Sequence, residues 1–189
     1  YLLPFLGLLI VFIYQFEKQG GGTNLVLESV REGKRIPFRM APMIFISTVL
    51  THLGGGSAGR EGAALQLGGS IAVKIGEIFR ISEEKKKIMI MCGMAAGFSA
   101  LFGTPLAATV FAIEVVTVGV VQYSALVPCT IASLTAFEVA KLCGGHAESF
   151  LVTGIPEFTL GSALKIALLA FLCAALSILF CKTLHSAEH

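Results

Sequence analysis

The sequence predicts an all-α integral membrane protein whose helices are short, tilted or broken by glycine-rich loops. Hydrophobic residues make up 55% of the 189 residues and charged residues 14%, and the mean hydropathy is +0.83. A helix needs about 20 apolar residues to span a bilayer. Several apolar runs are shorter than that, which favours broken or steeply tilted helices. The runs are Leu2–Tyr14, Met40–Leu53, Ile88–Phe102, Leu106–Val121, Tyr123–Phe137 and Leu160–Cys181.

The first predicted helix, Leu2–Tyr14, leads into a glycine-rich loop and then into a short helix, Leu25–Arg31. The loop consists of Gly20, Gly21, Gly22, Thr23 and Asn24. Thr23 or Asn24 can cap the helix, and glycines leave backbone N–H groups accessible. A helix N-terminus with unpaired donors suits an anion. An anion site and a flexible linker are both consistent with this stretch.

A second glycine-rich loop, Gly54–Gly62, separates the predicted helices Met40–Leu53 and Ala63–Phe79. Irregular backbone at membrane depth is tolerated only where protein buries it or where it lines a cavity. Arg60 and Glu61 lie in this loop, and ionisable groups at such depth are costly and usually functional. The alternative is that the two side chains pair for structural reasons.

Glu61 falls at the start of the helix Ala63–Phe79, in the electrostatic field that would otherwise bind an anion. Its carboxylate can therefore act as a tethered anion. Protonation would neutralise the carboxylate and release it, which would couple a proton to the entry of an anion.

Basic residues form two clusters, and the net charge of +2 is too small to favour a nucleic-acid partner. Because the chain enters through Met40–Leu53 and returns through Ala63–Phe79, we expect both clusters on one side. The positive-inside rule makes that side cytoplasmic. The three lysines of the second cluster also fit a solvated helix start after Glu83 and Glu84. The clusters are Arg31, Lys34, Arg35 and Arg39, and Arg80, Lys85, Lys86 and Lys87.

The predicted helix Ile88–Phe102 contains Gly93 and Gly97. Two small residues four positions apart allow close packing of membrane helices. We therefore expect a neighbouring helix against this face.

A break at Gly103–Pro105 precedes the predicted helix Leu106–Val118, because proline fits the first turn of a helix. Glu114 lies near the end of this helix. It is either a proton relay or a packing carboxylate bonded to a neighbouring backbone end.

The last predicted helix, Leu160–Cys181, follows a turn at Gly154–Phe158. The five cysteines lack CxxC spacing and lie mostly in apolar runs, so they are interpreted as small buried residues. A metal pair of His185 and His189 would have no third ligand nearby. We expect neither a metal site nor a cofactor.

Two stretches resemble the CLC family of chloride channels and anion/proton antiporters. Gly59–Gly68 resembles the GREGP-type filter signature of the family, and Ala95–Ala108 resembles the stretch that follows it, in the same order and spacing. Gly20–Asn24 stands where the family has its first, GSGIP-type filter loop. The resemblance extends from about Gly20 to the last helix.

This resemblance implies a multi-pass transporter of the cell membrane, a homodimer in which each subunit has its own pore between two inverted halves. Residues 1–189 would be a single transmembrane region, the first repeat plus the start of the second, with the second half missing. Glu61 takes the place of the gating and proton-coupling glutamate. The anion-binding positions implied are Gly20, Gly21, Gly22, Gly59, Arg60, Gly62 and Ala63.

Some residues depart from the family pattern. Gly21 replaces the usual filter serine, and Asn24 replaces the loop proline. The intracellular proton glutamate of the chloride exchangers falls at Val115, one residue after Glu114, so Glu114 is interpreted as a proton-path or helix-packing residue.

The first loop, Gly103–Pro105 and Phe111–Val115 together resemble the bacterial fluoride-exporting branch of the family. The implied partners are a fluoride or chloride ion, protons and the lipid bilayer. Three hypotheses follow: an anion/proton antiporter that exports fluoride, a chloride channel or chloride/proton exchanger, and a membrane enzyme that uses Glu61 or Glu114 as an acid or base. The apolar runs contain no Ser/His pair, HExxH or paired-aspartate motif, so an enzyme is not expected.

Overall fold

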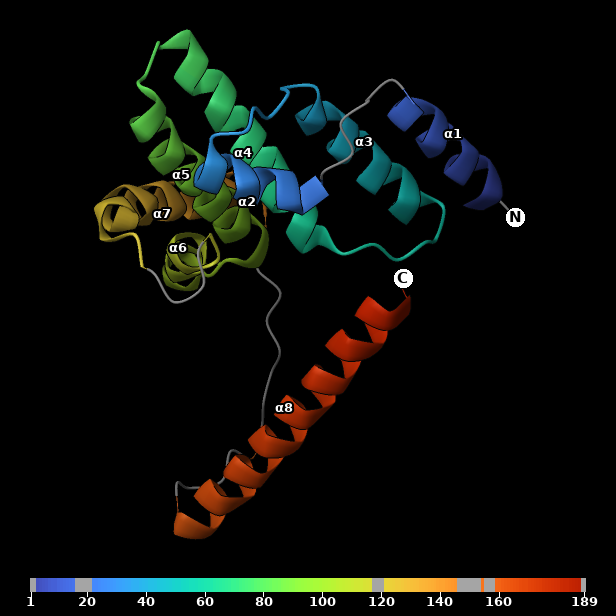
Figure 1. Ribbon diagram of the computed structural model, residues 1–189, viewed down its shortest axis with the longest axis vertical. Helices are drawn as coiled ribbons and strands as arrows, with labels where there is room; N and C mark the ends of the chain where they lie inside the picture. The colour runs from blue at the N-terminus through green and yellow to red at the C-terminus, as the bar shows by residue number, and fades with distance from the viewer. Residues whose placement is uncertain (1–2, 16–21, 117–120, 146–153, 155–158, 188–189) are drawn as a thin grey trace. The chain divides into compact units, whose positions relative to one another are not determined.

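The computed structural model describes residues 3–15, 22–116, 121–145, 154 and 159–187, which form helices and no strand (Figure 1). The chain divides into two units, Tyr1–Glu148 with α1 to α7 and Ser149–His189 with α8. The all-α class predicted from the sequence is confirmed. The elements are α1 (Leu3–Gln15), α2 (Gly22–Glu32), α3 (Met40–Leu53), α4 (Arg60–Ile78), α5 (Glu83–Phe102), α6 (Pro105–Glu114), the short 3-10 helix η1 (Tyr123–Ala125), α7 (Leu126–Leu142) and α8 (Leu160–Ala187).

Three helices begin ahead of their predicted starts. These are α2, α4 and α5, which begin at Gly22, Arg60 and Glu83. Hydrophobicity marks the part of a helix that is buried, whereas backbone hydrogen bonding continues into polar first turns. Thr23 and Asn24 therefore lie inside the first turn of α2, and the prediction that one of them caps the helix from outside is wrong.

Other helix limits follow the sequence closely. The helix α3 has the predicted limits, and Pro105 lies in the first turn of α6 as predicted, one residue before the predicted start at Leu106. Gly103 ends α5 with φ of 69°, a left-handed conformation that glycine adopts without steric cost. The helix α6 ends at Glu114, and the predicted end, Val118, lies outside the described residues.

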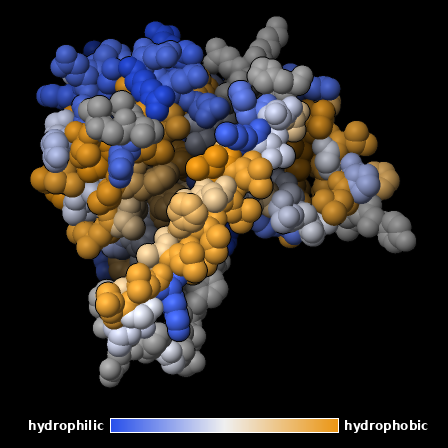
Figure 2. All heavy atoms as spheres, turned by 60° about the horizontal axis from the view of Figure 1, so that its bottom comes forward, coloured by the Kyte–Doolittle hydropathy of each residue, from blue (hydrophilic) through white to orange (hydrophobic). Residues whose placement is uncertain are grey.

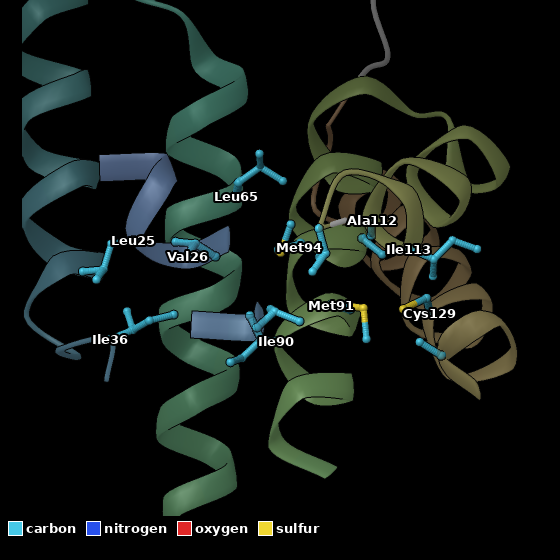
Figure 3. Packing of buried hydrophobic residues seen from close by; sticks show 14 of the residues in the cluster. Leu25, Val26, Ile36, Leu65, Ile90, Met91, Met94, Ala112, Ile113 and Cys129 are labelled. Carbon is cyan, nitrogen blue, oxygen red and sulfur yellow. The ribbon is translucent and has the colours of Figure 1, made fainter. Parts of the chain in front are cut away.

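The core of the first unit is centred on α5 (Figure 3). Met91 and Met94 of α5 are fully buried, with at most 1% of their surface exposed. Val26 of α2 lies on one side of them, and Ala112 of α6 and Cys129 of α7 lie on the other. One apolar cluster therefore joins α2, near the start of this unit in the sequence, to α6 and α7, near its end.

Buried hydroxyl groups link α5, α6 and α7. Ser99 Oγ donates to the Ser133 carbonyl at 2.7 Å, and the hydroxyl groups of Thr109 and Ser133 lie 2.8 Å apart. All three residues are at most 2% exposed. A hydroxyl buried without a partner is costly, so these bonds specify how the three helices pack.

The helices α4 and α5 approach each other through glycines. A Cβ atom built on Gly68 would collide with the backbone of Gly93, and one built on Gly93 would collide with the backbone of Gly68. A Cβ atom on Gly97 would lie 2.6 Å from the Ala64 carbonyl oxygen. The close packing predicted from Gly93 and Gly97 is confirmed.

The described part of the second unit is the apolar helix α8. None of the described residues of α8 is buried, and its surface is largely hydrophobic (Figure 2). In the described chain, Tyr123–Leu142 and Leu160–Ala187 are long and apolar enough to span a membrane. Cys173 and Cys181 of α8 are exposed, as is Cys143, so the expectation of buried cysteines is wrong for these three.

We predict that Gly68→Ala in the full-length protein destabilises it by about 1–3 kcal/mol, because the added methyl group meets backbone rather than a flexible side chain. The matched control is Gly7→Ala, since a Cβ atom on Gly7 of α1 meets nothing within 4 Å. Thermal unfolding in detergent measures both variants. Equal melting temperatures for the two variants would contradict the prediction.

Candidate functional site

The N-termini of α2 and α4 meet, although the two loops that precede them are far apart in the sequence. Gln66 Nε2 of α4 donates a hydrogen bond to Thr23 Oγ1 of α2 at 3.3 Å. A Cβ atom on Gly62 would lie 2.7 Å from the same hydroxyl oxygen, and one on Gly22 would lie 4.0 Å from Gln66 Nε2. The first turns of both helices therefore share one small volume.

Glycine is favoured at two of these positions for different reasons. Gly22 begins α2 with φ of 48°, a conformation that other residues rarely adopt. Gly62 has no positive φ, but a Cβ atom there would force the Thr23 side chain to shift. Glycine at both positions allows the two helix starts to come together.

Each helix start presents unpaired backbone donors. The first four N–H groups of an α-helix have no partner within the helix, and the aligned peptide dipoles add partial positive charge there. In α4 these groups belong to the turn that contains Glu61, Gly62 and Ala63. Two such ends in one place form an arrangement suited to a small anion.

Glu61 lies in the first turn of α4 and is exposed in the described structure. Its carboxylate is folded back over the residue before the helix, because a Cβ atom on Gly59 would lie 2.9 Å from Glu61 Oε2. Gly59 has an extended backbone, with φ of −63° and ψ of 131°. The carboxylate thus lies beside the positive end of its own helix, and glycine at position 59 leaves room for it.

Arg60 and Ala63 face another side of α4. Both line an apolar hollow of about 390 Å³ between α3, α4 and α5, together with Phe45 and Leu67. Their side chains are therefore separated from the side of α4 that carries Gly62 and Gln66. The backbone N–H of Ala63 still belongs to the first turn.

Glu114 is not part of this arrangement. It is the last residue of α6, which packs chiefly against α5 and α7, and its side chain is exposed. Within the described residues it makes no hydrogen bond or ion pair, so a bond to a neighbouring backbone end is not formed there. A role in a proton path stays a prediction. Gly20 and Gly21 lie outside the described residues.

Sequence reasoning missed the link between Thr23 and Gln66. Gln66 is 8% exposed, and its amide needs a partner in that position. A lone glutamine within the apolar stretch Ala63–Gly69, one turn after the loop, was the available signal. One turn further, Ser70 is fully buried, and its hydroxyl makes no hydrogen bond within the described residues.

A family model and several known proteins that resemble this chain agree on one family. Residues 5–189 match the family model described as Voltage gated chloride channel. The Chloride/fluoride channel protein of Pseudomonas syringae pv. tomato is 34% identical over 188 residues, which are 98% of this chain and 42% of that protein. The H(+)/Cl(-) exchange transporter ClcA of Yersinia pestis bv. Antiqua is 35% identical over 115 residues, 60% of this chain and 24% of that protein.

A solved structure agrees with this family. The crystal structure of a CLC-type fluoride/proton antiporter is 38% identical, with a TM-score of 0.84 over 90% of this chain and 44% of that chain. The chain therefore spans less than half the length of these relatives.

We predict that Thr23→Val destabilises the full-length protein by about 1–3 kcal/mol, because it leaves the buried Gln66 amide without this acceptor. The control is Thr135→Val, whose hydroxyl donates to the Ile131 carbonyl of its own helix and is exposed. We expect the control to change stability by about 0.5 kcal/mol or less. Thermal unfolding in detergent distinguishes them, and a loss in the control as large as in Thr23→Val would refute the link.

Proposed function

Because the chain belongs to the voltage-gated chloride channel family and is thus part of an integral membrane protein, we propose that it contributes to an anion/proton antiporter that exports fluoride across the cell membrane. The names of two similar proteins support this substrate. One is a chloride/fluoride channel protein and the other a fluoride/proton antiporter.

The observation that carries the proposal is the meeting of the α2 and α4 N-termini with Glu61 in the first turn of α4. Unpaired N–H groups replace part of the hydration shell that an anion loses when it enters the protein. We assign anion contacts to the backbone around Gly22, Gly59, Gly62 and Ala63. Arg60 adds positive charge to the same turn, although its side chain lines the neighbouring hollow.

Glu61 supplies the coupling. While ionised, its carboxylate competes with the transported anion for the positive end of α4, beside Gly59. Protonation removes the negative charge and with it most of the attraction, so the side chain leaves and an anion takes its place. Each exchange of carboxylate for anion therefore involves one proton.

The remaining residues of the site are assigned from the sequence and from the family. Gly20 and Gly21 directly precede Gly22 in the sequence, and we assign them to the anion path. Glu114 is a candidate for the intracellular proton path. In an inverted-repeat transporter both halves contribute helix ends to a site near the midplane. We propose that α8 opens the second repeat and that the full-length protein is a homodimer.

Exchange of chloride for protons is the second candidate. It is supported by the similarity to the Yersinia transporter, which is named for that exchange. A passive chloride channel would use the same helix ends without coupling to protons.

We predict that Glu61→Gln in the full-length protein lowers anion-coupled proton transport by more than about tenfold, a change of about 1.4 kcal/mol. The amide resembles the protonated carboxyl group in shape but cannot exchange a proton. Proton and anion fluxes are measured together in liposomes. Glu138→Gln is the control, because Glu138 is an exposed residue of α7 that lies 3.5 Å from Lys141. Coupled exchange at the wild-type rate in Glu61→Gln would disprove the assignment.

We also predict that fluoride leaves loaded liposomes faster than chloride. Gly21 lacks the hydroxyl donor of the usual filter serine, a contact worth about 0.5–1.5 kcal/mol. Gly21→Ser should therefore raise chloride efflux by up to about tenfold, as ion-selective electrodes can measure. Gly161→Ser on α8 serves as the control, since a Cβ atom there is 4.0 Å from its nearest neighbour, Thr159 Oγ1. Chloride efflux that exceeds fluoride efflux in the wild type would favour the chloride exchanger.

A further inference from the structure

We propose that a basic cavity between the start of α5, the end of α4 and the connection from α2 to α3 binds the phosphate group of an anionic phospholipid. The cavity has a volume of about 430 Å³ and is separate from the meeting point of the α2 and α4 N-termini. Residues of both basic clusters line it, so parts of the two clusters meet in one place. The basic lining residues are Lys34, Arg35, Arg80, Lys86 and Lys87.

The cavity has an apolar floor beneath a charged rim. Ile36 and Ile90 line it and are each 3% exposed, so they also belong to the core of the unit. Val73 and Ile81 add partly buried apolar surface. A charged rim beside apolar surface matches a lipid, whose phosphate adjoins hydrocarbon, better than it matches a fully hydrated ion. Figure 2 shows a strongly hydrophilic patch over one end of the first unit, beside hydrophobic surface.

Positive charge exceeds negative charge in this cavity. Five basic residues and two acidic ones, Glu77 and Glu83, line it, which leaves a formal surplus of three positive charges. Glu83 is already paired with Lys86 at 2.7 Å, and Glu77 lies 3.5 Å from Lys74. The hydrogen bond from Lys86, together with the charges of Lys86 and Arg35, holds the pKa of Glu83 below its ordinary value. Each of these two acids therefore already has a lysine beside it, which offsets part of its negative charge.

Three of the five basic lining residues, Arg35, Arg80 and Lys87, form no ion pair within the described residues. Lys34 pairs with Glu28 at 2.6 Å and with Glu32 at 3.5 Å. Lys87, by contrast, donates only to the Arg31 carbonyl at 3.3 Å, and Arg80 makes no ion pair in the described chain. Lys87 and Arg80 remain available for the oxygens of a phosphate, which accept several donors at once.

The backbone at Arg80 supports a role for its side chain. The N–H of Arg80 bonds to the Glu77 carbonyl and that of Ile81 to the Gly76 carbonyl, a pattern that ends a helix with one left-handed residue. Arg80 is that residue, with φ of 51°, and it is the one non-glycine residue with positive φ in the described chain. Glycine is favoured at this position, so arginine here is not explained by the stability of the turn.

Native mass spectrometry of the full-length protein tests the proposal, with phosphatidylglycerol and phosphatidylcholine of the same acyl chains as probes. We expect phosphatidylglycerol to bind more tightly, and Arg80→Gly and Lys87→Gln each to lower its affinity about fivefold. Lys85→Gln removes the same charge from an exposed residue of α5 that does not line the cavity, and it should leave the affinity unchanged.

Arg80→Gly also separates binding from folding, because glycine suits the left-handed turn. Its melting temperature should equal or exceed that of the wild type while lipid affinity falls. Equal loss of affinity in Lys85→Gln, or unchanged affinity in Arg80→Gly and Lys87→Gln, would overturn the proposal. Calorimetry with inorganic phosphate forms the second arm of the test. Phosphate binding that Arg80→Gly abolishes, without preference for phosphatidylglycerol, would support the phosphate site but identify a soluble ligand.

Discussion

The close contact between α4 and α5 is the constraint on which the rest of this unit depends. Gly68 and Gly93 face each other so closely that neither position has room for a Cβ atom. Lipid tails are as apolar as a leucine side chain, so membrane helices gain little from hydrophobic burial against each other and depend on close packing. The helix α4 has Glu61 at its beginning and Arg80 just after its end. The contact with α5 therefore positions both the candidate anion site and the basic cavity.

Neutral polar groups and charged groups occupy different parts of this protein. In the interior, hydroxyl and amide groups form the links between helices, as in the bonds between Ser99 and Ser133 and between Gln66 and Thr23. Charged groups gather at helix ends, where Arg31 Nε donates to the Val116 carbonyl beyond α6 and Lys87 to the Arg31 carbonyl near the end of α2. Neutral links avoid the desolvation cost of a buried charge. Glu61 also lies at a helix start, but it differs from the other charged groups because long apolar segments precede and follow it in the sequence.

The prediction of helix limits from the sequence was accurate where one physical signal, such as a long apolar run, dominates. Long apolar runs gave the limits of α3 and the approximate limits of α1 and α8. The spacing of Gly93 and Gly97 predicted a helix contact because small residues four positions apart allow the backbones of membrane helices to approach closely. The starts of α2, α4 and α5 were predicted too late, since their first turns are polar and only backbone hydrogen bonds define them. The same error made Thr23 a cap in the prediction, whereas it is a contact between helices.

The sequence by itself determined the class of the protein, its family, the two glycine-rich loops and the position of Glu61 at a helix start. These follow from composition and from neighbours along the chain. Only the tertiary structure decided that the two loops open helices that touch through Thr23 and Gln66, that Arg60 faces a different side of α4, and that Glu114 is exposed at the end of α6. It also brought Arg80 and Lys34 to one cavity. Each of these facts depends on the rotation of one helix against another, which side-chain packing determines and local sequence does not encode.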